Sequence, residues 1–206
     1  MSFDLQRDTL PSNVEVKGDS QQIVIVSFGE KSFNSECIVS VSGGSSAEVL
    51  GILFLTGEAI GHLKLGMTHK TQGTNGNVLI HAVVSDSATL NFEGMIKIEK
   101  SAQQTVSYLA NKNLLLSENA RAITIPGLEI EADDVRASHG ATISNLSAQD
   151  LFYMQSRGLT GSDARLMMVK GFLTKVIDKI EDQTIKAHIT NDLAKFMETK
   201  EGIINV

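Results

Sequence analysis

The chain has 206 residues, of which 42% are hydrophobic and 20% are charged, so it can bury a sizeable core as one or two domains. The longest apolar run, residues 49–55, is too short to span a membrane, and the first ten residues carry no pattern of a secretory signal. The net charge of −6 lies entirely in residues 1–146, and this acidic balance, without Trp and with two Tyr, argues against nucleic acid as a partner.

Residues 22–143 have the pattern of short β-strands. Apolar or β-branched runs follow one another, many alternate with period 2, and Gly, Ser, Asn or Asp residues separate them. The stretch VSGGSS at 41–46 lacks the lysine and the context of a phosphate-binding loop, so it is interpreted as a turn between strands. Cys37, the only cysteine, cannot form an intramolecular disulfide, which together with the lack of a signal predicts a reducing cytoplasm.

A small alanine-containing motif recurs between these runs, around Ala88, Ala102, Ala120 and Ala132. Every second member has a similar spacing, with 32 residues from Ala88 to Ala120 and 30 from Ala102 to Ala132. One turn of a two-sided β-solenoid needs about two strands and two corners, which fits this spacing, and small corner residues let successive turns stack closely. We therefore expect a β-solenoid, with a β-sandwich as the alternative.

The hydrophobic period changes at Ser147. SAQD at 147–150 is typical of a helix cap with Ser147 as the N-cap, and TGSD at 160–163 opens a second helix. A third helix follows, which Gly202 can end. The apolar residues of the second and third helices fall at helical spacing: Leu166, Val169, Phe172, Leu173, Val176, Ile177 and Ile180, then Ile185, Ile189, Leu193, Phe196 and Met197. About sixty residues are too few for a robust separate core, so this region is expected to pack on the solenoid or on a partner.

Motifs of catalysis are absent. The chain has no phosphate-binding loop, dinucleotide fingerprint, serine-hydrolase elbow or zinc-protease helix, so we expect that it is not an enzyme. His62, His69 and His81 lie on or between strands without a carboxylate or thiol at metal-ligand spacing, and they are interpreted as solvated or hydrogen-bonded.

His139 stands apart in the stretch ADDVRASHGAT, residues 132–142. Gly140 and Ala141 beside it are small, so a ligand or another backbone could approach the imidazole closely. Composition alone favours a structural histidine, and a working ligand or base is the alternative. Asp133 and Asp134 cannot share one proton if they are neighbours on a strand, because adjacent strand residues point to opposite faces.

Residues 113–159 resemble the C-terminal core of the SufB/SufD family, whose members are scaffold components of the SUF iron–sulfur cluster assembly machine. The resemblance rests on NLLLSENARAITIPGLEIEADDVRASHGATISNLSAQDLFYMQSRGL, which is nearly continuous with the family pattern. It extends more weakly over residues 92–108 and 164–172. SHG, where a SufB-like chain tends to have HE, favours the SufD-like side, in a short form without the family's N-terminal helical extension.

This resemblance implies a right-handed parallel β-helix over residues 1–146 and a helical region over 147–206. It implies a non-catalytic scaffold subunit that dimerises through the solenoid end, with a SufB-like chain or a second copy as the partner. The implied interface residues are Ser138, His139, Gly140 and Thr142. His139 would also be a metal ligand shared with the partner at a transient iron–sulfur cluster, whereas the isolated chain, with one cysteine, is expected to hold no stable cluster.

The same resemblance implies that the helical region docks a SufC-like ABC ATPase. The expected docking residues are Arg157, Ser162, Asp163, Arg165 and Phe172. Family members often have Cys where this chain has Ala137, which leaves a second hypothesis open: a structural β-solenoid interaction module without cluster chemistry. Neither nucleic acid nor a membrane is expected as a partner.

Overall fold

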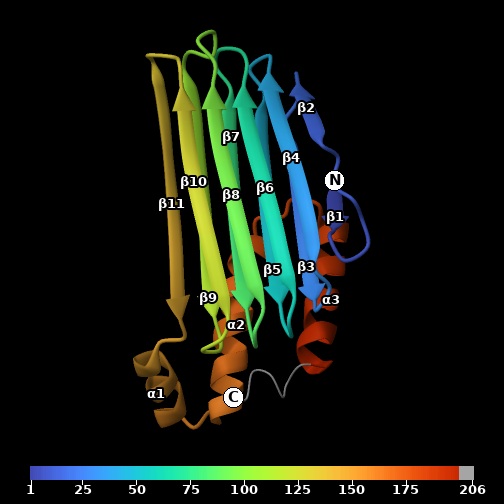
Figure 1. Cartoon of the computed structure of the whole chain (residues 1–206), viewed down its shortest axis with the longest axis vertical. Coiled ribbons are helices and arrows are strands. Elements are labelled where there is room, and N and C mark those ends of the chain that lie inside the picture. Colours follow the sequence, from blue (N-terminus) through green and yellow to red (C-terminus); the bar gives the residue numbers. More distant parts are fainter. Residues whose placement is uncertain (200–206) are drawn as a thin grey trace.

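The structure is a computed structural model that describes residues 1–199. Within them, eleven strands are followed by three helices (Figure 1). The strands are β1 (Ser2–Asp4), β2 (Asn13–Lys17), β3 (Gln21–Gly29), β4 (Phe33–Ser42), β5 (Ser46–Leu55), β6 (Ile60–His69), β7 (Asn75–Val84), β8 (Thr89–Ile98), β9 (Thr105–Leu115), β10 (Arg121–Ile130) and β11 (Val135–Asn145). The helices are α1 (Ala148–Ser156), α2 (Gly161–Ile177) and α3 (Gln183–Thr199).

The strands alternate between two parallel sheets. Sheet A has the order β1-β3-β5-β7-β9-β11, and sheet B has the order β2-β4-β6-β8-β10, so each strand pairs with the strand two places along the chain. This winding makes a β-solenoid of about five turns, and it confirms the predicted fold class. A sandwich is excluded, because every strand pair described here is parallel.

Side chains from both sheets fill the space between them, which we call the lumen. The corner alanines are part of this core: Ala88 and Ala102 are fully buried, and Ala120 and Ala132 are nearly so. The stretch at 41–46 is a corner, as predicted, because Gly43 and Gly44 both have positive φ, of 68° and 71°. The alanine repeat therefore marks the places where the chain turns from one sheet to the other.

The strand prediction differs from the structure in three places. It missed β1 and β2, which are short, and of which β2 carries charged residues on its outer face. The sequence also has two apolar runs, TVSYLA at 105–110 and NLLLS at 113–117, which predict two strands. Residues 105–115 instead form one strand, because Asn111 and Asn113 point inward without interrupting the pairing of β9 with β7. Asp133 and Asp134 lie in the corner before β11 rather than on a strand, so the argument from alternating faces does not apply to them.

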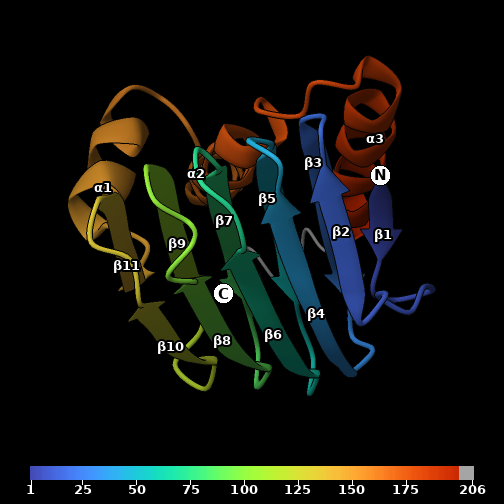
Figure 2. The same ribbon diagram turned by 90° about the horizontal axis from the view of Figure 1, so that it is seen from above.

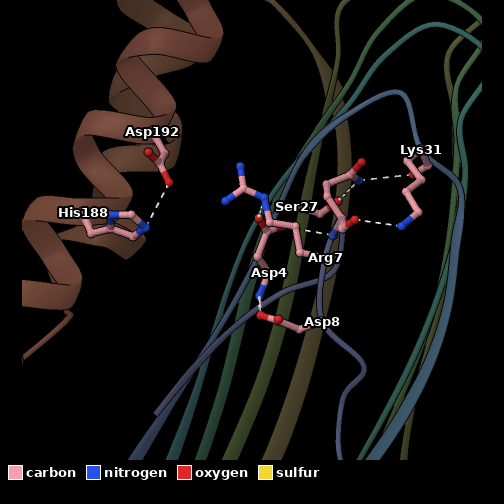
Figure 3. A network of polar contacts seen from close by, with 8 residues as sticks. Asp4, Arg7, Asp8, Ser27, Lys31, His188 and Asp192 are labelled. Atoms are coloured by element: carbon pink, nitrogen blue, oxygen red, sulfur yellow. Dashed lines mark hydrogen bonds and ion pairs between the residues drawn. The ribbon is translucent and has the colours of Figure 1, made fainter.

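Residues 5–12 cover the first turn of the solenoid. Leu5 and Leu10 belong to the lumen core, with exposures of 4% and 6%. The Gln6 side chain donates to Ser27 Oγ at 2.7 Å, and Lys31 Nζ donates to the Gln6 carbonyl at 2.8 Å (Figure 3). These contacts hold the loop against β3 and the corner after it, so the first end of the lumen is enclosed by the chain itself.

The helices cover sheet A and leave sheet B bare (Figure 2). A second core lies between α2, α3 and the outer face of sheet A, and the predicted helical stripes supply it: Val169, Leu173, Val176, Ile177 and Ile180, then Ile189, Leu193 and Met197. Phe196 packs on Phe54 with ring centroids 5.1 Å apart. None of the described helices is long and apolar enough to cross a membrane.

Helices α1 and α2 both begin within the stretches that the sequence indicated, SAQD and TGSD. Ser147 caps α1, because its side chain accepts from the Asp150 N–H at 3.2 Å. The cap of α2 is Thr160, whose hydroxyl accepts from the Asp163 N–H, while Ser162 is already inside the helix. The predicted stop at Gly202 lies outside the described residues.

Candidate interface at the open end of the solenoid

The last turn of the solenoid has no cover from the described residues. β11 is the edge of sheet A and β10 is the edge of sheet B (Figure 1). The inward side chains of this turn are only half-buried or are exposed, as Leu128, Val135 and Ala137 illustrate. The backbone of β11 pairs with β9 on one side only, so its other side presents N–H and C=O groups that another strand could use.

His139 lies in the middle of this edge strand. Its register partner on β9 is Leu109, which is fully buried in the lumen core, and the partner of Leu109 on β7 is Val78. His139 therefore continues an inward-facing column of apolar side chains, and it is exposed because no further turn within residues 1–199 covers it. The structure places the imidazole on the end face of the solenoid.

The other predicted interface residues lie beside it on β11. Ser138 pairs in register with Tyr108, and the hydroxyl of this tyrosine lies 3.6 Å from the place of a Cβ at Gly140, an ordinary van der Waals distance. The Thr142 carbonyl accepts from Asn113 Nδ2 at 3.2 Å. The four residues thus share one strand, with His139 on its inward face and Ser138 on its outward face.

A layer of buried polar side chains lies one turn below the end face. Asn113 Nδ2 also donates to Asn111 Oδ1 at 2.6 Å, so two adjacent inward positions of β9 are linked to each other and to β11. Among the described residues, Asn111 Nδ2, Asn113 Oδ1 and Thr124 Oγ1 are buried without a hydrogen-bond partner. Sequence reasoning missed this layer. The sequence did contain an indication of this layer, because two Asn residues at alternate positions of a strand are unusual for a buried core.

The remaining candidate ligands lie away from the end face. Cys37 is 2% exposed inside the lumen, and burial raises the pKa of its thiol, which favours the protonated form. His69 is fully buried, with Nδ1 2.9 Å from Thr74 Oγ1 and Nε2 3.0 Å from Ser107 Oγ. Burial lowers the pKa of His69 to about 4, so this imidazole is neutral near pH 7. Both residues are structural parts of the core.

The predicted docking residues of the helical region fall into two groups. Arg157 lies over the Tyr153 ring at 5.3 Å, and Ser162 and Arg165 line a hollow between α1 and α2. Asp163 accepts from Thr160 Oγ1 at 2.6 Å. Phe172 instead faces sheet A, where it stacks on His81 with centroids 4.5 Å apart while its carbonyl contacts His81 Nδ1. The first group lies at the surface, and Phe172 anchors α2 to the solenoid.

Large apolar side chains are exposed beside the first group. Phe152 and Tyr153 on α1 are 73% and 59% exposed, and Met167 on α2 is 57% exposed. The helical stripes were predicted, but α1 has no buried residue, so its aromatic side chains are free of the core. Exposed aromatics of this size on one helical element are typical of a protein-binding surface.

Comparison with known proteins agrees with this architecture. Residues 9–172 match the family described as SUF system FeS cluster assembly, SufBD core domain. The chain is 37% identical over 138 residues to an iron–sulfur cluster assembly SufBD family protein of Synechocystis sp., covering 66% of this chain and 30% of that protein. It is 33% identical over 123 residues to the iron–sulfur cluster assembly protein SufD of Escherichia coli, covering 60% of this chain and 29% of that protein.

A third relative is the iron–sulfur cluster assembly protein SufD of Bacillus subtilis, which is 29% identical over 148 residues. The aligned residues make up 72% of this chain and 34% of that protein. The chain thus spans about a third of the length of these relatives. The family match covers more than half of the chain and includes the solenoid from β2 onward, the end face and most of α2. The chain therefore belongs to the SufB/SufD family.

Proposed function

We propose that the chain is a non-catalytic, SufD-type scaffold subunit of iron–sulfur cluster assembly, which associates through the open end of its solenoid. The observation that carries this proposal is the contrast between an enclosed first turn and an uncovered last turn with His139 exposed at its centre. The family to which the chain belongs is described as taking part in SUF iron–sulfur cluster assembly, which supports this reaction context. The partner at this end is a SufB-like chain or a second copy.

The open end offers two kinds of contact to such a partner. β11 is eleven residues long, so an adjoining strand could use its free backbone groups and extend sheet A. The half-buried side chains of the last turn would become buried at the same time, which favours association through the hydrophobic effect. A solenoid turn that stacks on the next one uses the same two interactions.

His139 gives the interface its chemistry. An imidazole can ligate iron or carry a proton near neutral pH, and its neighbours Ser138 and Gly140 can do neither at comparable strength. One imidazole is an incomplete ligand set, so the partner would supply the remaining ligands to the cluster under construction. The cluster is then the cargo of the complex, and it leaves when assembly is complete.

The helical region is proposed to dock a SufC-like ABC ATPase. Phe152, Tyr153 and Met167 supply exposed apolar area, and Arg157 lies over one of these rings. Removal of α3 would be a poor test, because α3 packs on Phe54 and β3 and its loss would uncover the outer face of sheet A. Phe152→Ala is a better test: it should weaken ATPase capture in a pull-down while leaving the thermal midpoint unchanged.

The cluster-assembly role is tested by co-expression of the chain with SufB-like and SufC-like partners, followed by iron and acid-labile sulfide analysis of the purified complex. His139→Ala should abolish the iron and sulfide content of the complex. His62→Ala is the matched control, since His62 is an exposed histidine on the outer face of sheet B, and it should change neither value. Normal iron and sulfide in the His139→Ala complex would refute the role of His139.

The second candidate function is an interaction module without cluster chemistry. Ala137, at a position where the family resemblance implies that cysteine is frequent, favours it. Under this hypothesis the complex forms through the same end face, but the wild-type complex contains no iron or acid-labile sulfide above the level of the His139→Ala variant. The same experiment therefore separates the two functions.

A further inference from the structure

The outward side chains of sheet B change character at the open end. The parallel register joins equivalent positions of successive turns into columns that run along the solenoid. One column contains Asn34, His62, Asn91 and Ile123, and the next contains Glu36, Lys64, Glu93 and Ile125, on β4, β6, β8 and β10 in each case. Three turns thus carry polar or charged side chains in both columns, and only the last turn carries isoleucine.

These two isoleucines are the most exposed large apolar side chains on the described strands. Ile123 is 53% exposed and Ile125 is 59% exposed. They lie on β10, the edge strand of sheet B, beside β11 at the open end (Figure 1). An edge strand that stays in water usually carries charged side chains, which prevent unwanted association. The change from polar columns to isoleucine at this edge is therefore the pattern of a surface that a partner covers.

The backbone edge of β11 is complete. In a parallel sheet, alternate residues of a strand bond to the neighbours on its two sides. The carbonyl of Asp134, directly before β11, accepts from the Gln104 N–H at 2.6 Å, so the even-numbered residues of β11 face β9. The odd-numbered residues, with His139 among them, face the free edge, and none of residues 135–145 is proline. Each odd-numbered residue of β11 therefore offers both an N–H and a C=O group.

The backbone edge of β10 is interrupted. The Arg121 N–H donates to the Ala88 carbonyl at 3.0 Å, so the odd-numbered residues of β10 face β8 and the even-numbered residues face the free edge. Pro126 is one of the even-numbered residues and has no N–H. A strand added here would lack a hydrogen bond at the middle of β10. Side-chain contacts must therefore contribute more to association at β10 than at β11.

We propose that the subunit that covers the open end also extends over the outer face of β10 and buries Ile123 and Ile125 under apolar side chains of its own. This inference rests on the proposed function, because it adds a second area to the interface proposed there. Neighbouring strands are about 4.8 Å apart, so a subunit that covers the edge of the last turn lies within one strand spacing of both isoleucines. The contact needs only a short overhang beyond the end face.

The occupant is a SufB-like chain rather than a second copy. A second copy would bring another His139 to the end face but no accessible thiol, because Cys37, the only cysteine, is 2% exposed inside the lumen. A cluster under construction requires more ligands than two imidazoles. The partner that supplies them is a different chain, and the apolar overhang on β10 belongs to that chain.

Polar replacement of the two isoleucines tests the contact. The double variant Ile123→Asn/Ile125→Lys gives the last turn the residue types that its columns carry in earlier turns, so the free chain should keep its thermal midpoint. Its affinity for a SufB-like chain, measured by titration calorimetry, should fall at least tenfold. The matched control is Ile38→Asn/Ile60→Lys, the same changes on the same face but three and two strands from β10, and it should bind like the wild type. Equal affinity of the wild type and the Ile123→Asn/Ile125→Lys variant would overturn the inference.

Ala141→Pro separates this inference from the proposed function. The N–H of Ala141 faces the free edge, so its removal breaks no bond within the sheet but should weaken an added strand. If Ala141→Pro weakens binding and Ile123→Asn/Ile125→Lys does not, the open end is the interface and the inference about β10 fails alone. If neither variant changes binding, association through the open end fails as well. Loss of self-association in the double variant, without any binding of a SufB-like chain, would assign β10 to a second copy and overturn the choice of occupant.

Methyl NMR tests the burial without changing the surface. A soluble paramagnetic agent should broaden the methyl signals of Ile123 and Ile125 in the free chain, because both side chains are exposed. The broadening of these two signals should be lost when the SufB-like chain is bound, whereas Ile38 and Ile60 should stay broadened. Full broadening of Ile123 and Ile125 in the complex would show that β10 remains in water and would overturn the inference.

Discussion

The two ends of the solenoid are built from the same kind of turn, but only the first end is covered by other residues of the described chain. At the first end, Leu5 and Leu10 are 4% and 6% exposed and belong to the same lumen core as Ile25, which is 1% exposed. At the last end, Ala137 is half-buried, and Ile143 is 47% exposed. The chain supplies a cover for one end and leaves the other end uncovered within the described residues.

Under the proposed function, this difference separates a structural end from an end that binds a partner. Stacked turns stabilise each other through nearest neighbours, so a terminal turn normally needs a cap. The N-terminal loop is such a cap, held by hydrogen bonds to β3 and its corner. The exposed turn retains a strand edge and a histidine where a cap would otherwise lie, which is the arrangement expected of a surface that another chain covers.

The largest expected effect is a loss of folding stability at the enclosed end. Leu10→Ala removes a core side chain from the enclosed end and should reduce the free energy of unfolding by about 2–5 kcal/mol. Ile143→Ala at the open end should reduce it by no more than about 0.5 kcal/mol, since that side chain is already half exposed. Urea unfolding of the two variants measures both values. Equal losses would show that the ends are not different in the free chain.

The next effect concerns the enclosed lumen. Burial lowers the pKa of His69 to about 4 in the folded chain, whereas the unfolded chain has an ordinary histidine value. Below pH 6.5 the unfolded state therefore binds a proton that the folded state does not, so stability is full above that pH and falls as the pH decreases toward 4. The expected loss is about 3 kcal/mol over that window, and stability should level off with respect to this group below pH 4.

His69→Gln isolates this contribution, because glutamine can hydrogen-bond but does not titrate. The pH dependence of urea unfolding between pH 6.5 and 4 should be shallower in the variant than in the wild type. His81, whose pKa is also lowered by burial, adds to the dependence in both proteins and cancels in the difference. Identical slopes for variant and wild type would mean that His69 is protonated without cost.

The smallest expected effect is on the stability of the open end. His139→Ala should change the free energy of unfolding of the free chain by less than about 0.5 kcal/mol, because the imidazole is exposed. If His139 is instead a satisfied structural residue, the loss should be about 1–3 kcal/mol. A thermal melt of the isolated variant distinguishes the two, and it is independent of cluster content.

The alanine spacing favoured a solenoid but left a sandwich open, and the change of period at Ser147 predicted the helices. The parallel β-helix and the interface strand around His139 were implied only by the resemblance to the SufB/SufD family. The cap at Leu5 and Leu10 was not predicted, because a loop shows no periodicity. The layer of Asn111 and Asn113 was missed because polar residues on a strand are usually taken to face water. The neighbours on the outer face of sheet B could not be predicted, because Ile38, Gly66 and Met95 meet only through a register that joins residues 28 or 29 positions apart.

Amide hydrogen exchange tests the central claim most directly, measured on the chain alone and in complex with SufB-like and SufC-like partners. The account predicts that amides of β11 exchange fast in the free chain and become protected in the complex, while β2 at the enclosed end is unchanged. Protection that appears along β1 and β2, with β11 still exchanging at its free rate, would contradict the assignment of the open end as the interface.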